Sequence, residues 1–156
     1  MTMAAATLGT ALQGIGGSTD SGACDDWATA WATYFADAVS STGATFTTNT
    51  TYIAAAKSAM ATAMSGLSVA GAGAAKVQAG IIAWWDYLVA NPTGSFTGSP
   101  ASVTKPTTLT SIAAALPSIF ASNQSGSVSA AVGCLAVATS IHGNNAGGKV
   151  AGKTIT

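Results

Sequence analysis

Few side chains in this sequence could take part in acid–base or metal chemistry. The chain has five Asp, five Lys and one His, and it has no Glu and no Arg. Three of the carboxylates, Asp20, Asp25 and Asp26, lie close together. A calcium-binding EF-hand needs a distal bidentate Glu, which is missing here. We therefore interpret these three residues as carboxylates at the start of a helix, where they complement its dipole.

His142 is the only imidazole. A catalytic triad would need an oriented nucleophile and an acid beside it, and the sequence has no G-x-S-x-G motif to single out a serine. We expect His142 to have a structural role at the end of a helix, where it bonds free carbonyl groups or interacts with the C-terminal dipole.

Two cysteines, Cys24 and Cys134, are too far apart in the sequence to form a zinc motif. Two interpretations remain open. Either both are small buried hydrophobic side chains, or they form a disulfide between the first long helix and the last, which requires an oxidising environment.

Glycines and tryptophans offer two further candidates for binding. The segment from Gly71 to Lys76 reads GAGAAK, which matches neither GxGxxG nor GxxxxGK[ST] and indicates a loop entering a helix. The pairs Trp27/Trp31 and Trp84/Trp85 could form a sugar-binding platform, but their helical spacing favours a core position, with one ring of the second pair at a rim or interface. We therefore assign no catalytic, cofactor-binding or metal-binding residue, and we expect no cofactor and no small-molecule substrate.

The scarcity of charge also limits the partners of this chain. Charged residues make up 6% of the sequence, against about 25% in an ordinary soluble domain. The net charge is zero and no basic run is present, which argues against binding to nucleic acid. The longest segment without a charge runs from Pro106 to Gly148. Its best apolar run, from Val128 to Ile141, is shorter than the roughly 20 residues that a membrane span needs, so we expect no span.

Apolar side chains recur at helical spacing in five segments, and residues 4–15 could hold a short sixth helix. The five segments are residues 24–40, 49–66, 74–91, 108–122 and 127–142. The segment 74–91 has the widest apolar arc and is expected to be the central helix, ending at Asn91 and Pro92. Within 108–122, Pro117 predicts a kink or a break near Leu116.

The last segment, 127–142, has five residues aligned on one helix face, and Gly143 is expected to end the helix as its C′ residue. The aligned residues are Val128, Val132, Leu135, Thr139 and His142.

These patterns predict an all-α fold, a single-domain bundle of five to six helices over residues 1–143. Residues 144–156 are rich in glycine and carry Lys149 and Lys153. We expect this segment to be a flexible tail, or one that becomes ordered against a partner.

Several stretches of the chain resemble small Ala/Gly-rich proteins of tailed bacteriophages. They are the segment from Gly71 to Trp85, Leu8-Gly-Thr-Ala-Leu, Trp31-Ala-Thr-Tyr-Phe, Phe120-Ala-Ser-Asn and Ser140-Ile-His-Gly. The resemblance implies a structural component of the virion and supplies no catalytic residues.

The composition agrees with such a role, because a nearly uncharged surface of small residues costs little to cover and does not repel its own copies. We expect a non-enzymatic virion protein that forms a homo-oligomer and contacts neighbouring virion proteins in the tail, the neck or on the capsid surface. Two alternatives are a small membrane-active protein of holin type and a virion-associated cell-wall hydrolase.

Overall fold

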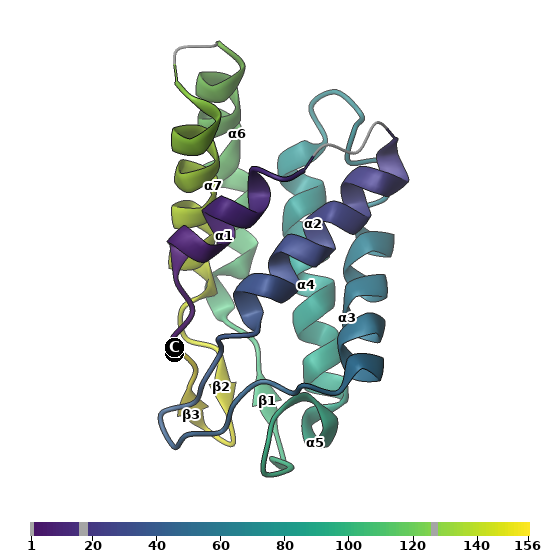
Figure 1. The fold of residues 1–156 in the computed structure, drawn as a ribbon, viewed down its shortest axis with the longest axis vertical. Coiled ribbons are helices and arrows are strands. Elements are labelled where there is room, and N and C mark those ends of the chain that lie inside the picture. Colours follow the sequence, from purple (N-terminus) through teal and green to yellow (C-terminus); the bar gives the residue numbers. More distant parts are fainter. Residues whose placement is uncertain (1, 16–18, 126–127) are drawn as a thin grey trace.

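The computed structural model describes residues 2–15, 19–125 and 128–156, and this part of the chain is mostly helical, with one small sheet (Figure 1). Six of its seven helices have two turns or more, and α5 is a single turn. The helices are α1 (Ala5–Leu12), α2 (Asp20–Phe35), α3 (Thr50–Ala63), α4 (Gly73–Ala90), α5 (Pro92–Ser95), α6 (Ile112–Gln124) and α7 (Ala130–Asn145). A 3₁₀ helix, Thr107–Ser111, leads into α6, and the strands are β1 (Val103–Thr104), β2 (Lys149–Val150) and β3 (Lys153–Thr154).

Local signals account for where several helices begin and end. The side chain of Asn49 accepts a hydrogen bond from the Thr51 amide at 3.0 Å, as expected of the residue that caps α3. Thr19 caps α2 in the same way, with its hydroxyl accepting from the Gly22 amide at 3.1 Å. The helix α4 ends at Ala90, directly before the Asn91-Pro92 pair that was predicted to stop it.

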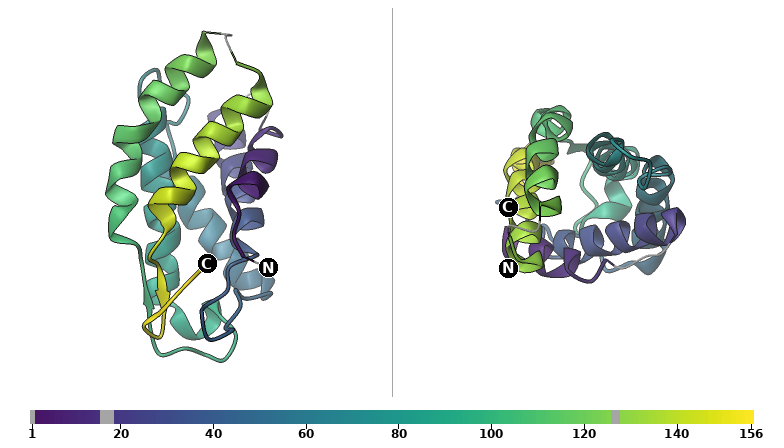
Figure 2. Two further views of the ribbon diagram at one scale, coloured as in Figure 1. Left: turned by 90° about the vertical axis from the view of Figure 1, so that its left-hand side faces the viewer. Right: turned by 90° about the horizontal axis from the view of Figure 1, so that it is seen from above.

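The six longer helices form a closed ring in which each one packs on two neighbours. Their order around the ring is α1, α2, α3, α4, α6 and α7, and α7 returns to α1, as the view from above shows (Figure 2). Side chains fill the middle of this ring, so the elements share a single hydrophobic core.

Aromatic rings make up the centre of that core. Phe35 on α2 contacts both tryptophans of α4 edge to face, with ring centroids 5.5 Å from Trp84 and 5.2 Å from Trp85. Trp27 and Trp31 are buried as well, as their helical spacing predicted. The expectation that one ring of the second pair lies at a rim or interface is wrong, because Trp84 and Trp85 are both fully buried.

The C-terminal segment explains the burial of Trp85 and differs from the tail expected for residues 144–156. It folds back as β2 and β3, which add to β1 in an antiparallel sheet of order β1-β2-β3. Val150 and Ile155 are buried, and Gly148 lies so close to the Trp85 ring that a Cβ atom there would lie 2.9 Å from its Cζ2. The missing glycine side chain lets this backbone cover the ring, which the glycine content alone did not reveal.

Two details of the last helices also differ from expectation. The helix α6 continues through Pro117 to Gln124, so the break predicted near Leu116 is absent. The helix α7 continues past Gly143 to Asn145.

The face that α7 turns to the core is not the predicted stripe. Val132 and Leu135 are 56% and 46% exposed, whereas Val137, Ala138 and Ile141 are buried. The helix is apolar on all sides, so its own sequence does not select a face. Close packing selects it, since Gly9 of α1 lies against the Leu135 backbone, where an added Cβ would lie 3.1 Å from the Leu135 Cα.

Candidate functional site

The one histidine of the chain belongs to a chain of four hydrogen-bonded side chains that starts in the core. The indole Nε1 of Trp85 donates to Asn145 Oδ1 at 2.8 Å. The Asn145 amide Nδ2 donates to the Tyr34 hydroxyl at 3.3 Å, and this hydroxyl lies 2.7 Å from His142 Nδ1. The series joins α4, α7 and α2, so it forms only when these three helices are in place.

The direction of these hydrogen bonds follows from the one group that can only donate. The Trp85 indole has no acceptor, so Asn145 must turn its oxygen toward it and its NH₂ group toward Tyr34. Tyr34 accepts that bond and passes its own proton to His142 Nδ1. His142 is therefore the acceptor at the end of the series, a neutral imidazole with its proton on Nε2.

Tyr34 is fixed in the role of donor. Burial raises the pKa of its hydroxyl to about 12, and the hydrogen bond from Asn145 offsets part of this rise. The hydroxyl therefore keeps its proton at physiological pH. Because that proton lies on His142 Nδ1, this nitrogen is occupied, and the imidazole has only Nε2 left for another partner.

A cavity of about 310 Å³ lies beside this series, where the C-terminal strand passes the start of the chain. His142, Tyr34 and Asn145 line one side of it, and Met3 and Ile155 line the other. The only titratable groups on its wall are His142 and Tyr34. His142 was expected to bond carbonyl groups or to interact with the helix dipole; it lies in the last turn of α7, but its Nδ1 bonds a tyrosine.

The sequence analysis did not identify the partners of His142. A signal was available for Asn145, which lies three residues after His142 and therefore on the same helix face. No sequence pattern pointed to Tyr34, because it lies more than a hundred positions away and was assigned only to the apolar stripe of its own helix.

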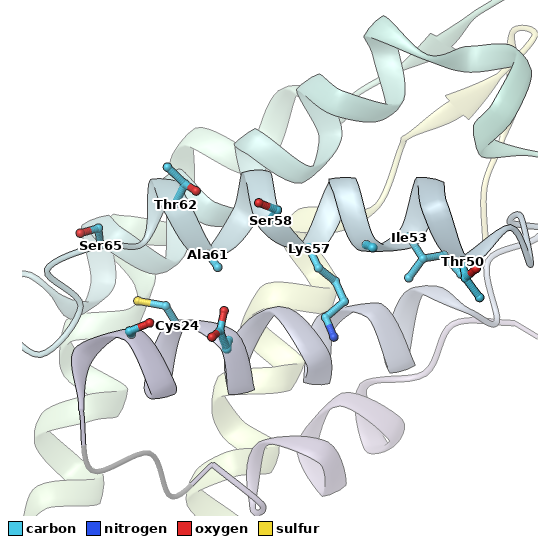
Figure 3. Close-up of a pocket in the computed structure, with 11 residues that line it drawn as sticks. Cys24, Thr50, Ile53, Lys57, Ser58, Ala61, Thr62 and Ser65 are labelled. Carbon is cyan, nitrogen blue, oxygen red and sulfur yellow. The ribbon is translucent and has the colours of Figure 1, made fainter.

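A second depression, a groove of about 720 Å³, runs between α2 and α3 (Figure 3). Its polar residues are Asp25, Lys57 and several hydroxyl side chains, and alanines line much of the rest. Cys24 lies at one end of the groove as a buried residue, and its thiol donates to the Met64 carbonyl at 3.3 Å. Burial, together with the negative charge of Asp20, raises the pKa of this thiol, so it is not activated as a nucleophile.

Both cysteines are free thiols. Cys134 is half-buried on α7, and burial raises its pKa too. Of the two interpretations left open by the sequence, the structure therefore contains unpaired thiols and not a disulfide.

Asp20 has a different role from the one predicted for it. It is the first residue of α2, but its carboxylate reaches across to the loop after α3. There it accepts from the Gly66 amide at 2.7 Å, and from both the Ser68 amide and the Ser68 hydroxyl. These hydrogen bonds, led by those of Ser68, lower the pKa of the Asp20 carboxyl to about 2. Asp20 is thus a clamp between two segments.

The remaining candidates are placed apart from one another. The described residues contain no group of three or more His, Cys, Asp or Glu side chains that could hold a metal ion. The Gly71–Lys76 stretch is the predicted loop entering a helix: Gly71 has a positive φ of 80°, and α4 begins at Gly73. Within the same described part of the chain, no helix has the length and apolar character of a membrane span.

The most exposed apolar surface lies on neither cavity but on α7. Val128, Val132 and Leu135 are three of the five large hydrophobic side chains exposed in the described part of the chain. They belong to the segment from Pro106 to Gly148 that has no charged residue. A surface of this kind binds another apolar surface and performs no chemistry.

Comparison with known proteins adds no relative to these observations: no family model, no curated protein and no solved structure matches this chain.

Proposed function

We propose that this chain is a non-enzymatic structural subunit of a tailed-bacteriophage particle, present in repeated copies in the tail or neck region or on the capsid surface. Its partners are copies of itself and neighbouring virion proteins. The likeness of several segments to Ala/Gly-rich phage proteins supports the phage context.

One observation carries the proposal, namely the scarcity of charge on the molecular surface. The accessible surface is 7089 Å² and the chain has ten charged side chains, so there is about one charge per 700 Å², roughly a quarter of the usual density. A protein with zero net charge and so few ions has little repulsion between copies. Such a surface suits a subunit that is covered by neighbours in a permanent assembly.

Small side chains favour the same role. Ala, Gly, Ser and Thr lose little conformational entropy when a neighbour covers them, so an interface made of them forms at a low entropic cost. The groove between α2 and α3 and the outer face of α7 are both built largely from such residues.

Quantitative mass spectrometry of purified particles tests the proposal. We expect the chain to be present in a fixed, repeated number of copies relative to the major capsid protein. Absence from purified particles, with the chain abundant in the lysate of infected cells, would contradict a structural role.

The two alternatives predict other outcomes of the same fractionation. A holin-like protein would be recovered with the host membrane and released only by detergent. A cell-wall hydrolase would clear peptidoglycan, and replacement of its acid–base residues, including His142, would abolish the clearing.

A further inference from the structure

The hairpin of α6 and α7 has an apolar patch that no other part of the chain covers. The patch consists of Val128, Val132 and Leu135, which are 36%, 56% and 46% exposed. The other two exposed large hydrophobic side chains of the described residues, Val69 and Val89, lie on other elements. Three exposed apolar side chains within eight positions form a continuous surface, and a surface of this kind marks a contact site.

A depression of about 220 Å³ lies beside the patch, between α6 and α7. Ile119 and Asn123 of α6 line one wall, and Val132, Gly133 and Ala136 of α7 line the other. Gly133 deepens it: a Cβ atom there would lie 2.7 Å from Asn123 Oδ1, so only a glycine lets the two helices approach this closely. A projecting side chain and a hollow thus lie next to each other.

The position of the hairpin keeps the patch open. The short helix α1 crosses α7 at Leu135, where Gly9 lies against the helix backbone. Beyond this crossing, α6 and α7 extend together toward the end of the molecule opposite the small sheet (Figures 1 and 2). Val132 and Val128 lie on this extension, one and two turns past Leu135.

We propose that this patch is the interface between two copies of the chain, a deduction that rests on the proposed function. The segment from Pro106 to Gly148 contains no Asp, Glu, Lys or Arg. A partner with charged residues would have to bury them here without a counter-charge, which is costly. A second copy brings an equally uncharged surface, and pairing the patch with itself brings no like charges together.

Symmetry favours the same occupant. In a two-fold contact each residue i of one copy meets residue j of the other, so a surface that has a projection beside a hollow can fit itself. Val132 of one protomer can fill the hollow between α6 and α7 of its partner, where Ile119 and Ala136 provide the apolar walls.

Cysteine cross-linking tests the contact directly. We would replace Cys134 by serine, since its half-buried thiol lies on the same helix, and keep the buried Cys24. In this background Val132→Cys is compared with Val89→Cys, an exposed valine on α4 that serves as the matched control. With a short bismaleimide we expect a covalent dimer of Val132→Cys, at least tenfold more than of Val89→Cys. Equal yields from the two variants would overturn the proposal.

A charge placed in the patch provides the second readout. Val132→Asp and Val89→Asp are compared by sedimentation and by light scattering over a range of concentrations. We expect Val132→Asp to weaken association at least tenfold and Val89→Asp to leave it unchanged. Both sites are exposed, so both variants should unfold at the wild-type temperature, and equal effects on association would refute the interface.

Particles separate the failure of this inference from failure of the proposed function. If the chain is present in repeated copies but Val132→Asp is incorporated and associates normally, the interface is wrong and the structural role stands. If the wild-type chain stays monomeric while Val132→Asp is lost from particles, the patch contacts a different virion protein, and pairing between copies is overturned. If the pair forms but particles lack the chain, only the phage role fails.

Discussion

The two halves of α7 treat their apolar side chains in opposite ways. In the C-terminal half, Val137 and Ile141 are buried, and the chain adds its own C-terminal strands and the hydrogen bond from Trp85 to Asn145. In the N-terminal half, Val132 and Leu135 are of similar size but about half exposed. Both halves lie in the segment without charges, so composition does not distinguish them.

The difference shows what a chain with few charges needs in order to bury its own surface. Where Gly148 admits a backbone against Trp85, the chain supplies the cover itself. Where α6 and α7 extend beyond α1, no further element is available, and the apolar surface stays open. Burial of one end and exposure of the other thus depend on which elements reach each end.

Truncation of one buried and one exposed side chain on α7 tests this contrast most strongly. Ile141 is fully buried, so Ile141→Ala should reduce the free energy of unfolding by about 2–5 kcal/mol through lost contacts and the cavity that remains. Leu135→Ala, at a half-exposed position, should change it by no more than about 0.5 kcal/mol. Urea unfolding measures both, and similar losses would show that the two halves are packed alike.

Removal of the Asn145 side chain should have the next largest effect. Asn145→Ala leaves the buried Trp85 indole without an acceptor, and we expect a loss of about 1–3 kcal/mol in the free energy of unfolding. Asn144→Ala is the matched control, because that amide bonds only the Ser140 carbonyl of its own helix and should cost less than about 0.5 kcal/mol. A double-mutant cycle with Tyr34→Phe should show coupling, whereas additive losses would mean that the side chains act independently.

A methyl group at Gly148 should disturb the cover over Trp85. Gly148→Ala places a Cβ atom against this fully buried ring, and overpacking of this kind costs about 1–3 kcal/mol. Gly143 is a helical glycine with open space around it, so Gly143→Ala should stabilise the protein by about 0.5–1 kcal/mol. Thermal unfolding, followed by the near-ultraviolet signal of the tryptophans, distinguishes the two. A neutral Gly148→Ala would mean that the C-terminal segment does not hold this position.

The Asp20 clamp should give the smallest effect, visible only as a dependence on pH. Its carboxyl pKa is lowered in the folded protein from 3.8 to about 2, so the unfolded chain takes up a proton first as the pH falls. The stabilisation is therefore complete above the unfolded pKa and disappears as the pH falls through the folded one.

We expect the unfolding temperature of the wild-type chain to fall more steeply from about pH 5 to about pH 2 than that of Asp20→Asn. Asp25→Asn removes the same charge from an exposed site on α2 and is the control. Parallel curves for the wild type and Asp20→Asn would show that the loop contacts do not depend on the charge.

Helical periodicity was a sound guide to the helices themselves. The wide apolar arc of residues 74–91 corresponds to α4, whose Val77, Ile81 and Leu88 are buried, and Asn49 caps α3 as predicted. These features depend on neighbours within a few residues, so the local sequence is sufficient to specify them.

Periodicity was a poor guide to the orientation of α7. The aligned residues from Val128 to His142 suggested one apolar stripe, but valine, alanine and leucine occur on every side of this helix. The structure buries the face of Val137 and Ile141, which packs closest to its neighbours. Similarly, the four side chains from Trp85 to His142 come from three helices, and none of them has a local signal that names its partner.

The sequence by itself determined the helical class of this protein, most of its helix positions and a surface with very few charges, because each of these follows from local propensity or from composition. Only the tertiary structure decided which face of α7 is buried, that the C-terminal segment covers Trp85, and that His142 accepts a proton from Tyr34. These outcomes depend on how closely backbones can approach and on contacts between residues far apart in the chain, and a helix rich in alanine and glycine does not encode them in its own pattern of side chains.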